Sequence, residues 1–257
     1  MTLPRLRATL SGVLLGVAVA TAAVLAQTPP AGRETSAASV AQYKLSESMP
    51  VDPEVRLGTL PNGLRYYVRP NGRPANRAEL RLVVKAGSVL EDDDQRGLAH
   101  FVEHMLFEGT EHFPGRSLVD FLSSLGLTIG ADANAETGYD ETQYILRVPT
   151  DVPGVLDRAM LVLQDWASGA TFDQAGIDRE RGIVLSEWRM NLGAGERIQN
   201  KIRGIQLQGS RYADRPPIGD PDVISHAQRE QLVRFYHDWY RPDLMAVIVV
   251  GDVDRDA

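Results

Sequence analysis

The sequence predicts an α+β fold in which a mixed, largely antiparallel sheet packs against helices. Short apolar stretches that alternate like strands are separated by longer stretches with helical spacing, and the two kinds follow one another irregularly. The strand-like stretches lie in hairpin-like neighbourhoods, which favours antiparallel pairing. We find no internal repeat, and 257 residues suffice for one large domain or two small ones.

The first half of the domain shows strand signals followed by helix signals. A Pro-Asn-Gly turn leads into an expected strand within residues 59–68, and alternating apolar residues predict a second strand at 80–84. The acidic run 91–94 is interpreted as the solvated N-terminus of a helix, where carboxylates interact favourably with the helix dipole. Apolar periodicity then predicts helices at 97–107 and 117–125.

The second half continues with three helices and two strands. Apolar residues three or four positions apart predict helices at 155–166, 173–190 and 225–240. Apolar strands are expected at 142–148 and 245–250. The intervening stretch 191–221 is rich in Gly, Arg and Pro and is expected to be a loop.

The composition excludes several classes of protein. The chain is 43% hydrophobic and 24% charged, which is typical of globular proteins and not of disordered, collagen-like or multi-span membrane chains. Its net charge is −7 and it has no basic run, which argues against a nucleic-acid partner. It contains no cysteine, so any transition metal must be held by His, Asp or Glu.

The N-terminus has the pattern of a signal peptide at residues 1–26. Arg5 and Arg7 precede an apolar run, and small residues at Val24 and Ala26 predict cleavage after Ala26. A membrane anchor is the alternative, because about 18 apolar residues can just span a bilayer. We favour export to the periplasm or the medium, without stable membrane insertion after processing. Residues 27–50, rich in Ala, Ser, Pro and Thr, are expected to be a flexible leader.

The motif His-Phe-Val-Glu-His lies in the first expected helix. Its histidines, His100 and His104, are four residues apart, so both imidazoles project from one helix face, where the spacing suits a single zinc ion. Glu103 lies on the same side and can act on a metal-bound water without being a ligand. This is the H-x-x-E-H order of the inverted zinc motif. The surrounding apolar residues indicate a buried helix, where three ionisable groups are costly unless a metal or other partners satisfy them.

A catalytic zinc site usually has a third protein ligand. The charged helix at 173–190 offers Glu180 and Glu187, which lie on one face because seven residues make nearly two turns. One carboxylate could bind zinc while the other orients a ligand imidazole. The spacing alone does not choose between them, and two solvated acids remain the alternative.

Three blocks of the sequence, HFVEHMLFEGT, RERGIVLSE and YRPDLMAVIVVGD, occur in an order that resembles the N-terminal domain of the pitrilysin-type (M16) zinc peptidases. The loop GSRYADRPPIGDP is most similar to the exported bacterial members. The resemblance implies one zinc ion per chain, held by His100, His104 and Glu187. It further implies that Glu103 is the general base and that Glu180 supports the site.

A fourth block, Asn134-Ala135-Glu136-Thr137, resembles the N-A-x-T segment of the same family. There it is an edge strand that pairs with the substrate backbone, so Asn134 and Ala135 are expected to bind substrate. Without the resemblance, Asn134 would be interpreted as an ordinary turn residue.

The resemblance also implies a domain organisation and a function. Residues 51–257 are expected to form the N-terminal zinc peptidase domain, with the C-terminal domain absent from this chain. The expected function is a zinc-dependent endopeptidase acting on extended peptides, with a second M16 domain or a partner subunit closing the cleft. The alternative is a non-catalytic partner subunit or a peptide-binding module, against which the intact His100, Glu103 and His104 argue.

Overall fold

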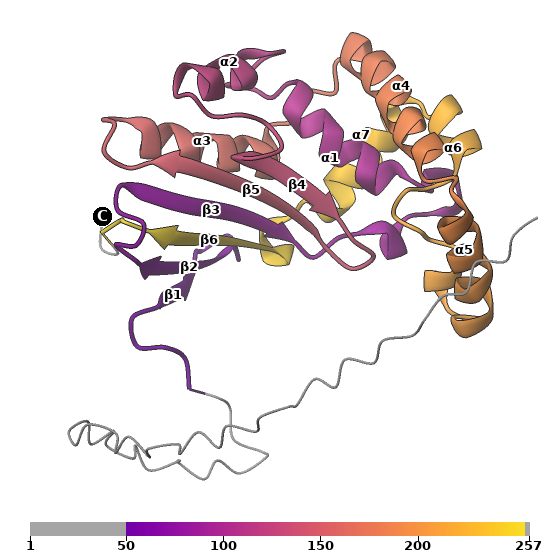
Figure 1. Ribbon diagram of the computed structural model, residues 1–257, viewed down its shortest axis with the longest axis horizontal. Coiled ribbons are helices and arrows are strands. Elements are labelled where there is room, and N and C mark those ends of the chain that lie inside the picture. Colours follow the sequence, from indigo (N-terminus) through magenta and orange to yellow (C-terminus); the bar gives the residue numbers. More distant parts are fainter. Residues whose placement is uncertain (1–49, 255–257) are drawn as a thin grey trace, which may run out of the picture. The chain divides into compact units, whose positions relative to one another are not determined.

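The computed structural model describes residues 50–254 (Figure 1). The expected signal peptide, residues 1–26, and residues 27–49 of the expected leader lie outside the described part. The strands are β1 (Arg56–Thr59), β2 (Arg65–Pro70), β3 (Arg77–Val84), β4 (Ala133–Thr137), β5 (Thr142–Pro149) and β6 (Met245–Gly251). The helices are α1 (Leu98–Glu108), α2 (Ser117–Ser124), α3 (Val155–Ser168), α4 (Gln174–Met190), α5 (Ala194–Gln206), α6 (Pro221–His226) and α7 (Arg229–Trp239).

The six strands form one sheet in the order β1-β2-β6-β3-β5-β4. All neighbouring strands are antiparallel except β2 and β6, which are parallel. The last strand in the sequence, β6, therefore lies in the interior of the sheet, and β4 lies at its edge. The predicted fold class, α+β with a mixed and largely antiparallel sheet, is confirmed.

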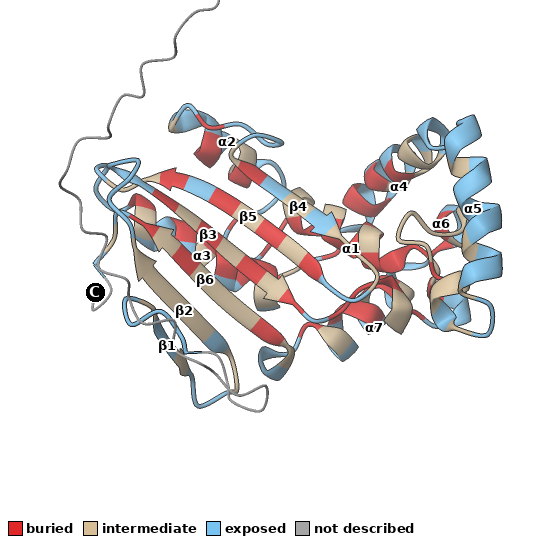
Figure 2. Cartoon of the chain, turned by 60° about the horizontal axis from the view of Figure 1, so that its bottom comes forward, coloured by how far each residue is buried: buried red, intermediate tan, exposed pale blue. Residues whose placement is uncertain are grey.

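The two faces of the sheet differ in polarity. In β3, Leu80 and Leu82 are fully buried, whereas Glu79 and Arg81 point to the opposite face and form an ion pair. Figure 2 shows this alternation of buried and less buried residues along the central strands. Helix α3 contacts β3 and β5 on the apolar face, and α1 contacts β4, α4 and α7. A half-buried strand with period-two alternation folds in this way because only one face meets the core.

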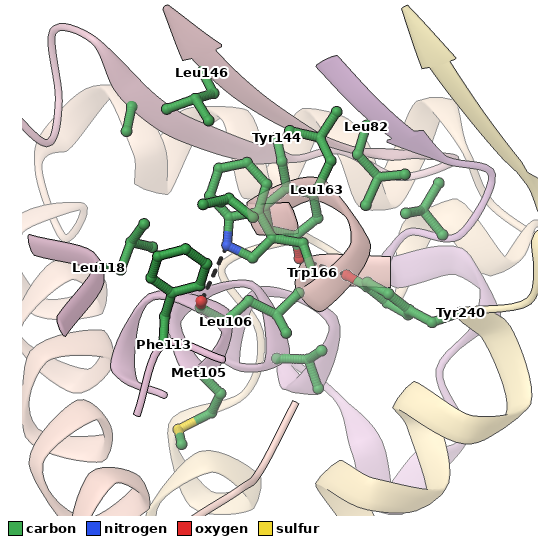
Figure 3. Close-up of a cluster of buried hydrophobic side chains, with 14 of the residues drawn as sticks. Leu82, Met105, Leu106, Phe113, Leu118, Tyr144, Leu146, Leu163, Trp166 and Tyr240 are labelled. Atoms are coloured by element: carbon green, nitrogen blue, oxygen red, sulfur yellow. Dashed lines mark hydrogen bonds between the residues drawn. The ribbon is translucent and has the colours of Figure 1, made fainter. Parts of the chain in front are cut away.

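An aromatic cluster fixes the C-terminal end of α1 against α3 and the sheet (Figure 3). Trp166 is fully buried, and its indole N–H donates a hydrogen bond to the Leu106 carbonyl at 3.1 Å. This carbonyl is among the last four of α1, which have no partner within the helix. The ring of Trp166 also lies 5.2 Å from that of Tyr144, whose hydroxyl is 2.6 Å from the Tyr240 hydroxyl. The position of α1 is therefore set by core packing.

Two sequence-based expectations about the helices are wrong. The expected loop 191–221 contains α5, an amphipathic helix with no buried residue. The sequence pattern of this helix is weak because glycines interrupt it, and its apolar residues Ile198, Ile202 and Ile205 are all exposed. The single helix expected at 225–240 is two helices, α6 and α7, separated before Arg229. Among residues 50–254, no helix is both long enough and apolar enough to cross a membrane.

Candidate metal centre

Helix α1 presents two imidazoles one turn apart. The Nε2 atoms of His100 and His104 are 3.2 Å apart, and the two rings meet edge to face. On the other faces of the helix, Phe101, Val102 and Met105 are buried in the core. This packing fixes the rotation of α1 about its axis, and it leaves both histidines directed toward α4 and the edge strand β4.

Helix α4 supplies two carboxylates that reach different atoms of the histidines. One Glu187 oxygen lies 3.5 Å from Nε2 of His100 and 3.6 Å from Nε2 of His104. Glu180, in contrast, lies 2.8 Å from Nδ1 of His104. The spacing along the sequence left the choice between these carboxylates open, whereas the geometry brings only Glu187 to the side where the two Nε2 atoms converge.

His100, His104 and Glu187 fit a metal ion. One donor atom from each lies within 4.8 Å of the others, and two imidazoles with one carboxylate form a usual donor set for catalytic zinc. Burial, with the nearby His104, lowers the pKa of His100 to about 4, so the ring is neutral and its Nε2 can be a donor. Burial alone would lower the pKa of His104 too, but the hydrogen bond with Glu180 and the neighbouring carboxylates raise it.

Glu103 lies beside this cluster without joining it. Glu103 is 8% exposed, and its carboxylate accepts a hydrogen bond of 2.5 Å from the Thr137 hydroxyl. Burial raises the pKa of Glu103, while the hydrogen bond from Thr137 and the nearby His104 oppose that effect. A carboxylate with a raised pKa next to a possible metal site is well suited to proton transfer.

Strand β4 brings Asn134 and Ala135 to the same site. It pairs with β5 along one edge and is the last strand of the sheet. Asn134 is exposed and Ala135 is half-buried, and both line a cavity of about 440 Å³ that the two histidines and Glu187 also line. Their roles in substrate binding stay predictions, but the strand has the position that such a role requires.

The N-terminus of α1 is held by an acidic residue that the sequence led us to place in solvent. Asp92, Asp93 and Asp94 are exposed as expected, but Glu91 is fully buried. One of its carboxylate oxygens accepts a hydrogen bond from the Ala99 N–H at 2.8 Å. Gly97, which precedes the helix, has no side chain to cap it, so Glu91 satisfies a free donor of the first turn. Burial raises the pKa of Glu91 to about 8, although this hydrogen bond opposes the shift.

Sequence reasoning did not identify every residue of the site. Thr137 stood in the quoted N-A-x-T block, but nothing in the sequence indicated that it bonds Glu103. Pro217 and Ile218, in the segment between α5 and α6, line a second cavity of about 290 Å³ next to Glu103. No local signal marks them, because their place depends on contacts between distant segments.

Comparisons with known proteins agree with the resemblance. The family model "Insulinase (Peptidase family M16)" matches residues 66–200, and the model "Peptidase M16 inactive domain" matches residues 226–257. A probable zinc protease, PqqL of Haemophilus influenzae, is 43% identical over 209 residues, which are 81% of this chain and 23% of the relative. The chain thus spans about a quarter of the length of that curated relative.

Two solved structures are similar as well. One is the crystal structure of the periplasmic protease PqqL from Escherichia coli, with a TM-score of 0.78 at 40% identity over 82% of this chain and 23% of that one. The other is the first half of the same protease, with the same TM-score and identity, of which the match covers 45%.

The burial of Glu91 predicts a pH dependence of stability. The folded protein holds this proton more tightly than the unfolded chain, because the pKa rises from 4.5 to about 8 on folding. The stabilisation is therefore complete below about pH 4.5 and is lost as the pH rises through about 8. Between pH 5 and 9 the loss amounts to about 4 kcal/mol, because about three pH units below the folded pKa contribute about 1.36 kcal/mol each.

Glu91→Gln should flatten this part of the profile, since the amide oxygen can still accept the Ala99 N–H without titrating. Urea unfolding of chelator-treated protein at pH 5, 7 and 9 measures the free energies. Glu141→Gln, at an exposed position, serves as the control and should keep the wild-type profile. Parallel profiles for the wild type and Glu91→Gln would contradict the assignment.

Proposed function

The chain belongs to peptidase family M16, and on this basis we propose that residues 51–257 form the N-terminal, zinc-binding domain of an endopeptidase that hydrolyses extended peptides. The observation that carries the proposal is the convergence of two imidazole Nε2 atoms and the Glu187 carboxylate next to a buried Glu103. A solvated, purely structural cluster would not need three donors of this kind within 4.8 Å of one another.

In this proposal each residue has a separate task. His100, His104 and Glu187 would hold one zinc ion, which when bound supplies Lewis acidity to a water molecule and to the scissile carbonyl. Glu103 accepts the proton of the attacking water and later delivers it to the leaving amine. Glu180 accepts the Nδ1–H of His104, which keeps the Nε2 lone pair directed toward Glu187.

The free edge of β4 would bind the substrate. An extended peptide can add to an exposed strand edge through its main chain, with Asn134 and Ala135 facing it. This mode requires a free backbone, so unstructured peptides are the substrate class. We propose further that a second M16 domain or a partner subunit closes the cleft, as the 45% coverage of the first half of PqqL suggests.

A zinc-content measurement tests the ligand assignment. We expect about one zinc ion per chain and a strong loss in Glu187→Gln, because a carboxamide is a poor zinc ligand. Glu180→Gln should weaken zinc binding only by about 10–100-fold, the usual effect of removing a partner of a ligand histidine. Chelator competition gives the affinities, and Glu230→Gln on α7 is the control. An unchanged zinc affinity in Glu187→Gln would show that Glu187 is not the third ligand and would assign that role to Glu180.

The role of Glu103 is tested by separating metal binding from hydrolysis. Glu103→Gln should retain zinc while hydrolysis of a quenched fluorescent peptide falls by about 10²–10⁴-fold, the usual contribution of a general base. Glu111→Gln, at an exposed position, should be active. Loss of zinc in Glu103→Gln would show that it is a ligand. If the wild type bound peptide but showed no chelator-sensitive hydrolysis, the protein would be a non-catalytic peptide-binding module and not an enzyme.

We also propose that the protein is exported and processed between Ala26 and Gln27. The sequence pattern supports this, as does the similarity to a protease described as periplasmic. N-terminal sequencing of the protein from a Gram-negative host should give Gln27 as the first residue. Ala26→Lys, which places a large charged residue at the cleavage site, should block processing. A mature protein that begins at Met1 and sediments with membranes would favour the anchor.

A further inference from the structure

The second cavity lies along β4 from the first. The cavity lined by Asn134 adjoins this one, because the two share His100, Glu103, Ala135 and Glu187. The second cavity is completed by Glu136 and Thr137 of β4, by Asn191 after α4, and by Pro217 and Ile218. A peptide along the strand edge would therefore cross the proposed metal centre with one cavity on each side of it.

The charges in the two cavities are arranged differently. In the first, Glu108 is paired with Arg179 at 2.5 Å and Glu180 with His104. In the second, no Lys or Arg lines the wall, and Glu136 is exposed and forms no ion pair with any residue of the described part. Glu136 thus lines this cavity as an exposed carboxylate that has no task in the catalytic scheme and no ion-pair partner among the described residues.

Pro217 and Ile218 add an aliphatic wall to this acidic cavity. The segment that carries them is fixed at both ends. Arg215, 6% exposed, donates to the Glu91 carbonyl at 2.9 Å and to the Asp93 carboxylate at 2.7 Å. The Arg215 carbonyl accepts a hydrogen bond from the buried Ser88 hydroxyl at 2.7 Å.

The other end of the segment packs directly on the start of α1. A Cβ atom on Gly219 would lie 2.2 Å from the Cα of Gly97, so the two backbones are in contact. The Asp220 N–H also donates to the Arg96 carbonyl at 3.2 Å. The wall is therefore held in place before a peptide binds, so contact with it costs little conformational entropy.

We propose that this cavity is a subsite for the side chain of a lysine or arginine residue in the bound peptide. The methylene groups would lie along Pro217 and Ile218, and the cationic end would meet Glu136. Long basic side chains combine these two properties, because their stems bury apolar surface while their heads stay polar. The inference rests on the proposed function, since it assumes that a peptide occupies the edge of β4.

Peptide binding tests the subsite without requiring turnover. The probes are fluorescent nonapeptides, with lysine or its uncharged analogue norleucine placed at each position in turn. They are titrated into zinc-loaded Glu103→Gln protein, and fluorescence anisotropy gives the dissociation constants. At one position we expect lysine to bind about fivefold tighter than norleucine, and the advantage to shrink at high salt, as for an exposed ion pair.

Variants assign that preference to residues. Glu136→Gln should abolish the lysine advantage, whereas Glu141→Gln, an equal charge change in the same hairpin, should preserve it. Glu136→Lys should shift the preference to a glutamate-bearing peptide, which a purely structural role of Glu136 would not produce. Ile218→Ala should weaken the binding of the lysine and norleucine peptides by similar factors.

The outcomes separate this inference from the proposed function. An equal lysine advantage in Glu103→Gln protein with and without the added Glu136→Gln change would overturn the subsite and leave the proposed zinc binding and hydrolysis standing. A lysine preference at Glu136 in a protein that neither binds zinc nor hydrolyses peptide would support the subsite and overturn the enzyme. If no peptide bound at any position, the subsite would be overturned together with the strand-edge mode of binding.

Discussion

The arrangement of the site depends on one constraint, the low solvent exposure of His100, Glu103 and His104 on a largely apolar helix. An ionisable group away from water is costly unless it is paired or hydrogen-bonded. Each group on α1 therefore requires a partner from another element: Glu180 for His104, Thr137 for Glu103, and Glu187 at the Nε2 atoms of both imidazoles. Helix α4 and strand β4 are in contact with α1 because they carry these partners as well as apolar surface.

The same constraint prepares the donors for a metal. Burial disfavours the charged form of His100, and the hydrogen bond between Glu180 and Nδ1 of His104 holds the second ring in place. Both ends of α1 are anchored independently, by Glu91 at its start and by Trp166 at its end. The positions of the donors thus follow from the folded chain itself, so little reorganisation would accompany metal binding.

The sequence predicted the parts of this site that depend on local periodicity. The H-x-x-E-H spacing identified the residues of α1, and the alternation of apolar residues identified most strands. It could not choose between Glu180 and Glu187, because carboxylates nearly two turns apart share a face and only the offset between α1 and α4 distinguishes them. Nor could it find the burial of Glu91 within an acidic run. The Ser88 hydroxyl donates a hydrogen bond to the Arg215 carbonyl, 127 residues further along the chain, a contact that no local pattern encodes.

The register of strand β4 determines which of its side chains turn toward α1. Ala135 and Thr137 turn toward α1, while Asn134 and Glu136 are exposed. Pairing of Ala135 with Tyr144 and of Thr137 with Thr142 fixes this alternation. A slip of one residue would exchange the two faces and bring Glu136 to Glu103 in place of Thr137. Two carboxylates would then share a site, and their repulsion would raise at least one pKa further. The pairing of β4 with β5 therefore determines both which backbone edge is free and which side chain supports Glu103.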